Sequence, residues 1–416
     1  MRPAPIALHM KPFQVPPLAF IIIVNQFLVA NVMNSIGLTM HATARFGAED
    51  FAVGMLGTVQ FTTYAALVWR GGLLSDRFPK RALMAVGLFA LSALLSMVPY
   101  ANSMPVLYLL AACTSAVQVI VIPADFGLIG QVANPARVSK LLGIAGFTFV
   151  FAGMIAAKLV GPLYENYGAK ITFHSAAAVS FVIATFICFF APRPHADSEL
   201  GRTPASEEAA ADRDAPAALT VEIPGAPASG LHRFLYAALA LNFLGFFVGF
   251  GHQTLLVRIA TIPELSMSFS EQSEVQSYRM MGAMLGYAIG ATWSGWQWKR
   301  WPFWVIGFWI LAVTMGAAFA PNTTVFTIAI GLGGIATALG NQLSLYYCVG
   351  AGMLSRGRGA GANEIALGGG AAIGTLAGGL AAQVAGTPRA ALFVPLVPII
   401  VAMCVWGYVF RRRQPE

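Results

Sequence analysis

Charged residues are scarce in this chain. Only 10% of its 416 residues are Asp, Glu, Lys or Arg, whereas 57% are hydrophobic. A soluble domain carries about 25% charged residues, so this chain has too few to cover a surface that faces water. The shortage excludes an ordinary soluble protein and predicts an all-α membrane protein.

Cysteine is also rare, and its positions exclude a disulfide framework. The four cysteines are dispersed among apolar runs without a Cys-x-x-Cys pair, at Cys113, Cys188, Cys348 and Cys404. This pattern is typical of small buried side chains.

The chain also lacks a Walker A lysine, an HExxH motif and a nucleophile elbow. We therefore expect no enzyme activity, no cofactor and no metal site.

Long apolar runs dominate the sequence instead. A helix needs roughly 20 residues to cross the hydrocarbon of a bilayer, and backbone groups in lipid must be paired within the segment. Twelve predicted spans lie near residues 17–41, 52–75, 82–101, 105–131, 141–163, 171–191, 233–258, 275–297, 302–320, 323–352, 360–385 and 389–411. The first follows Arg2 and Lys11, as a signal peptide would, but its length indicates a retained helix.

Basic residues predict the orientation. The loops on one side are rich in Lys and Arg, whereas those on the other hold mainly Arg45, Lys170, Arg258 and Arg389. The positive-inside rule places the basic loops and both termini in the cytoplasm. We predict a multi-pass protein of a bacterial inner membrane. The net charge of +8 suits the anionic inner leaflet, and no nucleic-acid partner is expected.

The composition changes abruptly in the middle of the chain. Residues 193–231 are rich in Ala, Pro, Ser and acids, which predicts a disordered cytoplasmic linker between two six-helix halves, 1–192 and 232–416. The halves show a faint repeat, because Gly72 aligns with Gly290 and Arg81 with Lys299 at one common offset.

The polar stretch between the second and third runs carries the most specific motif. It reads Gly72, three residues, Asp76-Arg77, two residues, then Lys80-Arg81. This stretch resembles the loop between helices 2 and 3 of major facilitator superfamily transporters, although Pro79 stands where the family usually has glycine. The resemblance implies twelve transmembrane helices in two six-helix pseudo-repeats and alternating access to a midplane site.

In that family the loop is thought to latch one conformation. By resemblance, Gly72 would let helices 2 and 11 approach closely, and Asp76 would accept hydrogen bonds from the N-terminus of helix 11. Arg77, Lys80 and Arg81 would face the inner leaflet or neighbouring acids. The alternative is an ordinary positive-inside loop.

Two further acids are candidates for the latch. Asp125, just after Pro123 in helix 4, would be costly in lipid unless paired. We favour a partner for the basic loop over a proton-coupling carboxylate or a solvated acid. Glu364 lies near the start of helix 11, where the helix dipole favours an acid in the first turn. A gating salt bridge with the first half is the alternative.

Polar side chains gather on helices 1, 4, 7 and 10, which surround the cavity in the family. Burying them in lipid would be costly, so we expect them to face the interior. Arg279, on helix 8, would clamp an anion with its planar fork, unless it snorkels to the interface. His252 would carry a coupling proton or have a structural role. The candidates for substrate contact are Asn31, Asn34, Gln118, His252, Gln253, Arg279, Asn341 and Tyr346.

Glycines repeat every fourth residue in helix 11, at Gly370, Gly374 and Gly378. They predict a smooth face for close helix packing.

Together these features predict a secondary transporter that moves a small solute by rocker-switch alternating access. Arg279 favours an organic anion. An efflux pump for amphipathic compounds and a non-transporting sensor with a transporter fold are the alternatives. We expect a monomer in the lipid bilayer whose partner is a small-molecule substrate, with coupling to protons left open.

Overall fold

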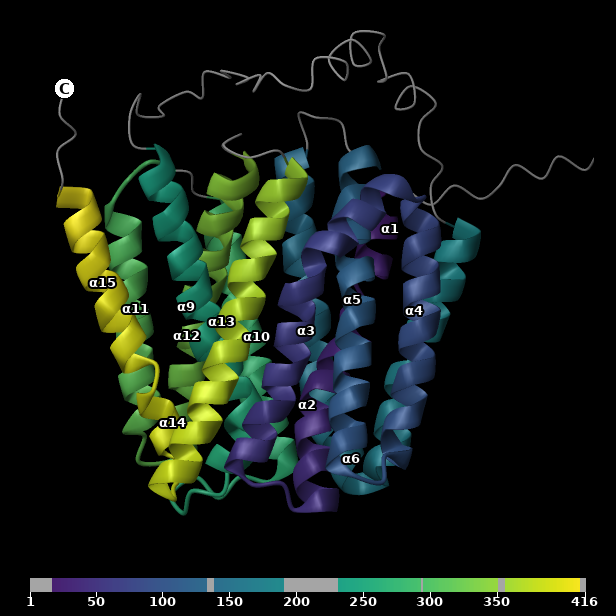
Figure 1. The fold of residues 1–416 in the computed structure, drawn as a ribbon, viewed down its shortest axis with the longest axis horizontal. Coiled ribbons are helices and arrows are strands. Elements are labelled where there is room, and N and C mark those ends of the chain that lie inside the picture. The colour runs from purple at the N-terminus through teal and green to yellow at the C-terminus, as the bar shows by residue number, and fades with distance from the viewer. Residues whose placement is uncertain (1–16, 133–137, 191–230, 293–294, 351–355, 412–416) are drawn as a thin grey trace, which may run out of the picture.

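The computed structural model of the chain describes residues 17–132, 138–190, 231–292, 295–350 and 356–411. These residues form a bundle of helices that run side by side (Figure 1), with no strand among them. The helices are α1 (Pro17–Val24), α2 (Phe27–Phe46), α3 (Asp50–Arg77), α4 (Lys80–Met97), η1 (Val98–Tyr100), α5 (Met104–Val132), α6 (Val138–Phe190), α9 (Leu231–Ile259), α10 (Phe269–Thr292), α11 (Trp301–Ala318), α12 (Thr323–Leu345), the π-helix η3 (Tyr346–Gly350), α13 (Arg356–Ala385), α14 (Ala390–Phe393) and α15 (Leu396–Arg411).

These helices agree with the predicted membrane spans. In the described part of the chain, 10 helices are long and apolar enough to cross a bilayer. One of them, α6, holds two predicted spans that meet at Gly168, where φ is 75°. The 24-residue α10 is long enough to cross but less apolar than the others. The arrangement is consistent with the expected twelve crossings, and the protein is a multi-pass membrane protein.

The first predicted span is interrupted where the sequence predicts one continuous helix. α1 ends at Val24, and α2 begins at Phe27. The Gln26 side chain donates to the carbonyl of Ile22 at 2.9 Å, which competes for the acceptor that the backbone would use. Asn25 donates to Thr148 of α6 at 2.7 Å. This hydrogen bond attaches the interrupted segment to α6.

The two ends of the bundle differ in the chain segments that lie there. At the linker end α6 finishes at Phe190 and α9 begins at Leu231; this is the upper end in Figure 1. At the opposite end, which we call the corner end, Gly47, Gly168 and Gly386 adopt positive φ. The predicted linker, 193–231, lies outside the described residues except for Leu231, the first residue of α9.

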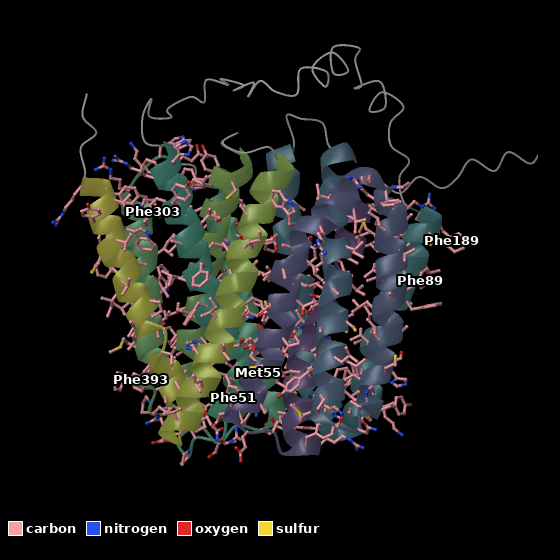
Figure 2. All side chains as sticks on the ribbon, in the orientation of Figure 1. Phe51, Met55, Phe89, Phe189, Phe303 and Phe393 are labelled. Carbon is pink, nitrogen blue, oxygen red and sulfur yellow. The ribbon has the colours of Figure 1, made fainter. Side chains whose placement is uncertain are left out.

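The described helices form an N half (α1 to α6) and a C half (α9 to α15). Between the halves, α3 packs along α13, and α6 packs along α10. The perimeter is apolar: Figure 2 shows Phe189 pointing away from the bundle, and 75% of this residue is exposed. An exposed phenylalanine of this kind suits a wall that faces lipid.

The buried apolar residues show how tightly the halves are joined at each end. One core cluster includes Leu38 and Met40 of the N half together with Leu255 and Phe326 near the corner end of the C half. At the linker end the C half has a separate core around Phe303, drawn from its own helices alone. The halves therefore share a core at the corner end.

Candidate functional site

Arg279 lies inside the bundle rather than at its surface. α10 begins at Phe269, six residues before the predicted span, which places Arg279 deeper in the helix. Its relative exposure is 7%, so it does not snorkel. Its Nε donates to Gln276 Oε1 at 3.0 Å, and a terminal nitrogen donates to Gln253 Oε1. The guanidinium also lies 5.5 Å from the ring centre of Phe250, within cation–π range.

Gln253 connects this cation to the N half. Its Nε2 donates to Ser35 Oγ of α2 at 3.2 Å. One turn away along α2, Asn31 accepts a hydrogen bond from Gln118 of α5. Asn31 and Ser35 are half-buried, whereas the residues between them are buried. They therefore mark a polar, partly accessible strip of α2 that faces the C half.

Four of the predicted contact residues thus come together on opposing helices. We call the group of Asn31, Gln118, Gln253 and Arg279, with Ser35 between them, the central polar group. Asn34 is separate from it: this side chain is fully buried and donates to Thr114 of α5 at 3.2 Å. Its hydrogen bond joins two helices of the N half, so its geometry is that of a packing contact.

The central polar group contains one positive charge, on Arg279, and no acidic residue. Among the described residues none of the three ion pairs includes Arg279. Its hydrogen-bond partners are neutral amides. A buried cation without an acidic partner is costly unless a charge is supplied from elsewhere. Its planar fork is suited to a carboxylate or phosphate, so the arrangement can hold an anion.

Aromatic rings border the same site. Phe250 of α9 contacts Phe61 of α3 edge-on, with ring centres 4.6 Å apart, and stacks with Phe246 at 5.4 Å. These rings give the cation an apolar wall that reaches both halves.

His252 lies in α9 one residue before Gln253 and therefore faces elsewhere. It is 6% exposed and lines a small cavity inside the C half with Arg279. Its Nε2 has no hydrogen-bond partner in the described structure. Arg279 is thus the one predicted residue that borders both this cavity and the central polar group.

A second polar group surrounds Glu364 and contains Asn341. Asn341 donates to the Tyr287 hydroxyl at 2.9 Å and accepts from Asn363 at 3.4 Å. The Tyr64 hydroxyl of α3 donates to Glu364 Oε2 at 2.7 Å, which links the two halves. Glu364 does not lie in the first turn of α13, which begins at Arg356 and has no acid there. Its cross-half partner is a tyrosine rather than the base of a salt bridge.

Replacing Tyr64 by phenylalanine is expected to lower the free energy of unfolding by about 2 kcal/mol, since a buried acceptor left without its hydrogen-bond partner costs about 1–3 kcal/mol. Titration with a denaturing detergent would measure the loss. Tyr167→Phe is the matched control, because Tyr167 is 66% exposed and should change little. Equal stability of the two variants would contradict a structural role for the Tyr64 contact.

Tyr346 lies apart from both polar groups. It belongs to η3, and its ring meets Trp296 at 5.1 Å and Trp298 at 6.0 Å. These partners belong to the aromatic packing at the linker end of the C half. The structure therefore places Tyr346 away from the Arg279 side chain.

The motif from Gly72 to Arg81 differs from a simple loop. Residues 72–77 are the last turns of α3, and only Phe78 and Pro79 separate α3 from α4. Gly72 does not make the expected close approach, since an added Cβ would meet nothing within 4 Å. Gly71 makes a different close approach, to α5, because its Cβ would lie 2.0 Å from the Val119 carbonyl. Pro123 removes the N–H that would otherwise bond this carbonyl.

The predicted charge pairing of this motif is also different. Arg81 donates to the carbonyl of Cys188 at the end of α6. Asp125 is 3% exposed, yet none of the ion pairs among the described residues includes it. Arg77 is exposed and Lys80 half-buried. The side chain of Asp76 lies outside the described part of the structure. Its predicted contact with the N-terminus of α13, the eleventh predicted span, therefore stays a prediction.

The glycines of α13 lie against α9. A Cβ added to Gly370 would lie 2.2 Å from the Phe243 carbonyl, and one added to Gly374 would lie 2.2 Å from that of Phe247. At Gly378 it would meet Leu255 at 2.6 Å. A side chain at Gly370 or Gly374 would push the two helices apart because it would meet backbone, whereas at Gly378 the Leu255 side chain could move aside.

Sequence reasoning missed several members of these groups. Gln276 could have been found, because it lies three residues before Arg279 on the same helix face. Phe250, Tyr287 and Asn363 carry no local signal that distinguishes them from packing residues. Lys158 of α6 forms an ion pair with Glu274 of α10 at 2.6 Å.

Known proteins resemble this chain in sequence and in fold. The family model described as Major Facilitator Superfamily matches residues 18–278. No curated protein sequence matches the chain. A bacterial homologue of the human lysosomal transporter Spinster, in an inward-facing and occupied conformation, has a TM-score of 0.67 at 14% identity over 96% of this chain and 98% of its own. The nucleoside transporter NupG has a TM-score of 0.68 at 13% identity over 95% and 100%.

Proposed function

The chain belongs to the major facilitator superfamily, and we propose that it is a secondary transporter of a small organic anion, bound between its halves at Arg279. One observation carries the choice of an anion. Arg279 is buried beside Gln253 and Gln276, and no ion pair among the described residues compensates its charge. An anionic substrate would supply the missing charge and accept hydrogen bonds from the guanidinium.

The neutral members of the central polar group would orient that substrate. Asn31 and Gln118 approach from the N half, and Gln253 approaches from the C half. Amides can donate to or accept from a hydroxyl, amine or carbonyl of the substrate. Because they come from both halves, a bound solute would contact both sides of the interface, as alternating access requires.

The shared core at the corner end supports a conformation that is closed there. By the positive-inside rule, we place the linker end and both termini in the cytoplasm and the corner end on the outer side of a bacterial inner membrane. Transport would then require the halves to separate at the corner end and approach at the linker end, in a rocker-switch movement.

Uptake into proteoliposomes tests the role of Arg279. With a panel of labelled monocarboxylates, dicarboxylates and organic phosphates, Arg279→Ala is expected to lower kcat/KM at least tenfold for the transported anion. A hydrogen bond to a charged group contributes about 1.5–3 kcal/mol, and about 1.4 kcal/mol is tenfold. Arg279→Lys should lose less, because it keeps the charge without the fork. Arg45→Ala, at an exposed arginine near the corner end of α2, is the control.

The same assay separates the alternatives. Unchanged transport by Arg279→Ala of every anion that the wild type carries would reject the anion proposal. Preferential flux of neutral or cationic amphipathic compounds would favour an efflux pump, for which the rings of Phe61, Phe246 and Phe250 form a suitable apolar wall. Binding without flux for any compound would favour a sensor.

A further inference from the structure

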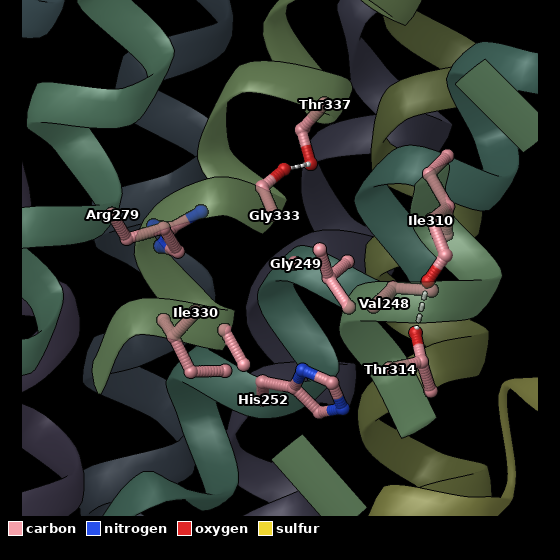
Figure 3. Close-up of a pocket in the computed structure, with 11 residues that line it drawn as sticks. Val248, Gly249, His252, Arg279, Ile310, Thr314, Ile330, Gly333 and Thr337 are labelled. Atoms are coloured by element: carbon pink, nitrogen blue, oxygen red, sulfur yellow. Dashed lines mark hydrogen bonds between the residues drawn. The ribbon is translucent and has the colours of Figure 1, made fainter. Parts of the chain in front are cut away.

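A small cavity lies inside the C half, behind the central polar group. It is lined by residues of four helices of that half, α9, α10, α11 and α12, and its volume is about 20 Å³. Figure 3 shows Arg279 on α10 and His252 on α9 among the residues that line the cavity. A cavity needs about 10–15 Å³ to hold one water molecule, so this one has room for a single atom-sized ligand.

Four polar side chains line the cavity, those of Arg279, His252, Thr314 and Thr337. The two threonine hydroxyls have already used their protons, so Arg279 and His252 are the groups left to donate. Arg279 can only donate, and its Nε and one terminal nitrogen are engaged with the amides of Gln276 and Gln253. The hydroxyls of Thr314 and Thr337 donate to backbone carbonyls of their own helices at 2.7 and 3.0 Å. The rest of the lining is largely apolar, including Ile310 and Ile330.

His252 supplies the second polar wall. It is 6% exposed, and its Nε2 has no hydrogen-bond partner in the described structure. A buried polar atom without a partner is uncommon in folded proteins and indicates a missing ligand or water. The cavity beside it is the space that such a ligand would occupy.

Charge then selects the kind of ligand. The Arg279 cation repels metal ions, and none of the ion pairs in the described structure neutralises it. The cavity has room for about one water-sized ligand, and a carboxylate or phosphate has several heavy atoms. We propose that this cavity binds a single chloride ion, held between Arg279 and His252, which serves as the counter-ion for Arg279 while no anionic substrate is bound. Binding of the ion does not depend on the transport proposal.

Thermal unfolding of the purified full chain tests this site. Sodium gluconate is replaced stepwise by sodium chloride or bromide at constant ionic strength. A ligand that binds the folded state raises the melting temperature with its concentration. We expect a saturable rise with both halides and none with gluconate, which cannot enter the cavity. Crystals soaked in bromide should show an anomalous peak between Arg279 and His252.

Variants locate the effect. His252→Phe keeps a ring of similar size without nitrogen and should abolish the halide-dependent rise. His41→Phe is the matched control, since His41 is 3% exposed and also has an Nε2 without a partner in the described structure, yet lies in the N half. Gly333→Leu, which fills the cavity wall from α12, should act like His252→Phe and provides a second variant if that protein does not fold.

The outcomes are decisive in both directions. Equal melting temperatures in gluconate and halide, with no bromide peak, would mean that the cavity holds water, and the proposal would be wrong. A full halide effect in His252→Phe would place the ion elsewhere and would also overturn it. Failure of Arg279→Ala to impair anion flux would reject the transport proposal and leave the bromide result intact.

Discussion

Adding a single methyl group at Gly161 is expected to shift the protein toward a conformation that is open at the corner end. Gly161 lies in α6 where it crosses α10 of the other half, and an added Cβ would lie 2.2 Å from the Phe269 carbonyl. A backbone carbonyl cannot rotate away as a side chain can, so Gly161→Ala must separate the halves locally. Overpacking of this kind costs about 1–3 kcal/mol, and we expect the upper value.

A cost of about 3 kcal/mol corresponds to a roughly 150-fold change in an equilibrium. Because Gly161 touches the other half, the cost falls on the conformation in which the corner ends are joined. Gly146→Ala, in the same helix, is the control: its added Cβ would meet Tyr287 at 3.8 Å, an ordinary contact. Both changes raise helix propensity by about 1 kcal/mol, so their difference isolates the clash.

Spin-label distances would measure the shift. Labels at Tyr100 and Val384, which are 61% and 80% exposed near the corner ends of the two halves, report their separation in a background without the native cysteines. Gly161→Ala should lengthen the main distance, and Gly146→Ala should not. The same short distance in both variants would show that the interface absorbs a methyl group, contrary to the expectation.

The helices of this protein were predictable because a segment in lipid must be apolar and must pair its own backbone groups. Each crossing needs an apolar run of about 20 residues with every backbone group paired inside it, and such runs are visible in the sequence. The interruption at Gln26 could not be seen in this way. It arises from one side chain that competes for the Ile22 carbonyl, within a run that remains apolar.

The candidate site was predictable in its residue types and not in its pairings. Arg279, Gln253, Asn31 and Gln118 stand out because polar groups are costly in lipid. Which of them meet depends on how the halves pack: Gln253 reaches Ser35 across 218 positions of sequence. The motif at Gly72 shows the same limit, since its neighbour Gly71 makes the close contact with α5. Composition does not distinguish two adjacent glycines whose side-chain positions point in different directions.

Loss of the Arg258 side chain is expected to destabilise the closed corner end more than loss of Lys158, although both bases pair with acids across the halves. Arg258 Nε lies 2.8 Å from Asp50 Oδ1, with side chains 25% and 10% exposed. Lys158 Nζ lies 2.6 Å from Glu274 Oε1, with side chains 59% and 44% exposed. The shorter distance belongs to the more exposed pair, so distance and burial predict opposite rankings.

Burial should decide the ranking. Arg258→Gln leaves the Asp50 carboxylate largely buried without its base, and removal of one partner from a buried pair costs about 3–5 kcal/mol. The value should fall near 3, because Asp50 lies in the first turn of α3, where the helix dipole contributes about 0.3–1 kcal/mol to a carboxylate. Lys158→Gln should cost about 0–1 kcal/mol, as exposed pairs do. The Tyr100–Val384 spin-label distance would report both variants.

A double variant separates loss of attraction from the cost of a stranded charge. If Arg258→Gln acts by leaving Asp50 uncompensated, then Asp50→Asn combined with Arg258→Gln should restore much of the short distance, because replacement of both partners is often close to neutral. If the ion pair instead holds the halves together by its own attraction, the double variant should open as far as the single one. Recovery would mean that the buried apolar core at the corner end keeps the halves closed, and that the ion pair selects their alignment.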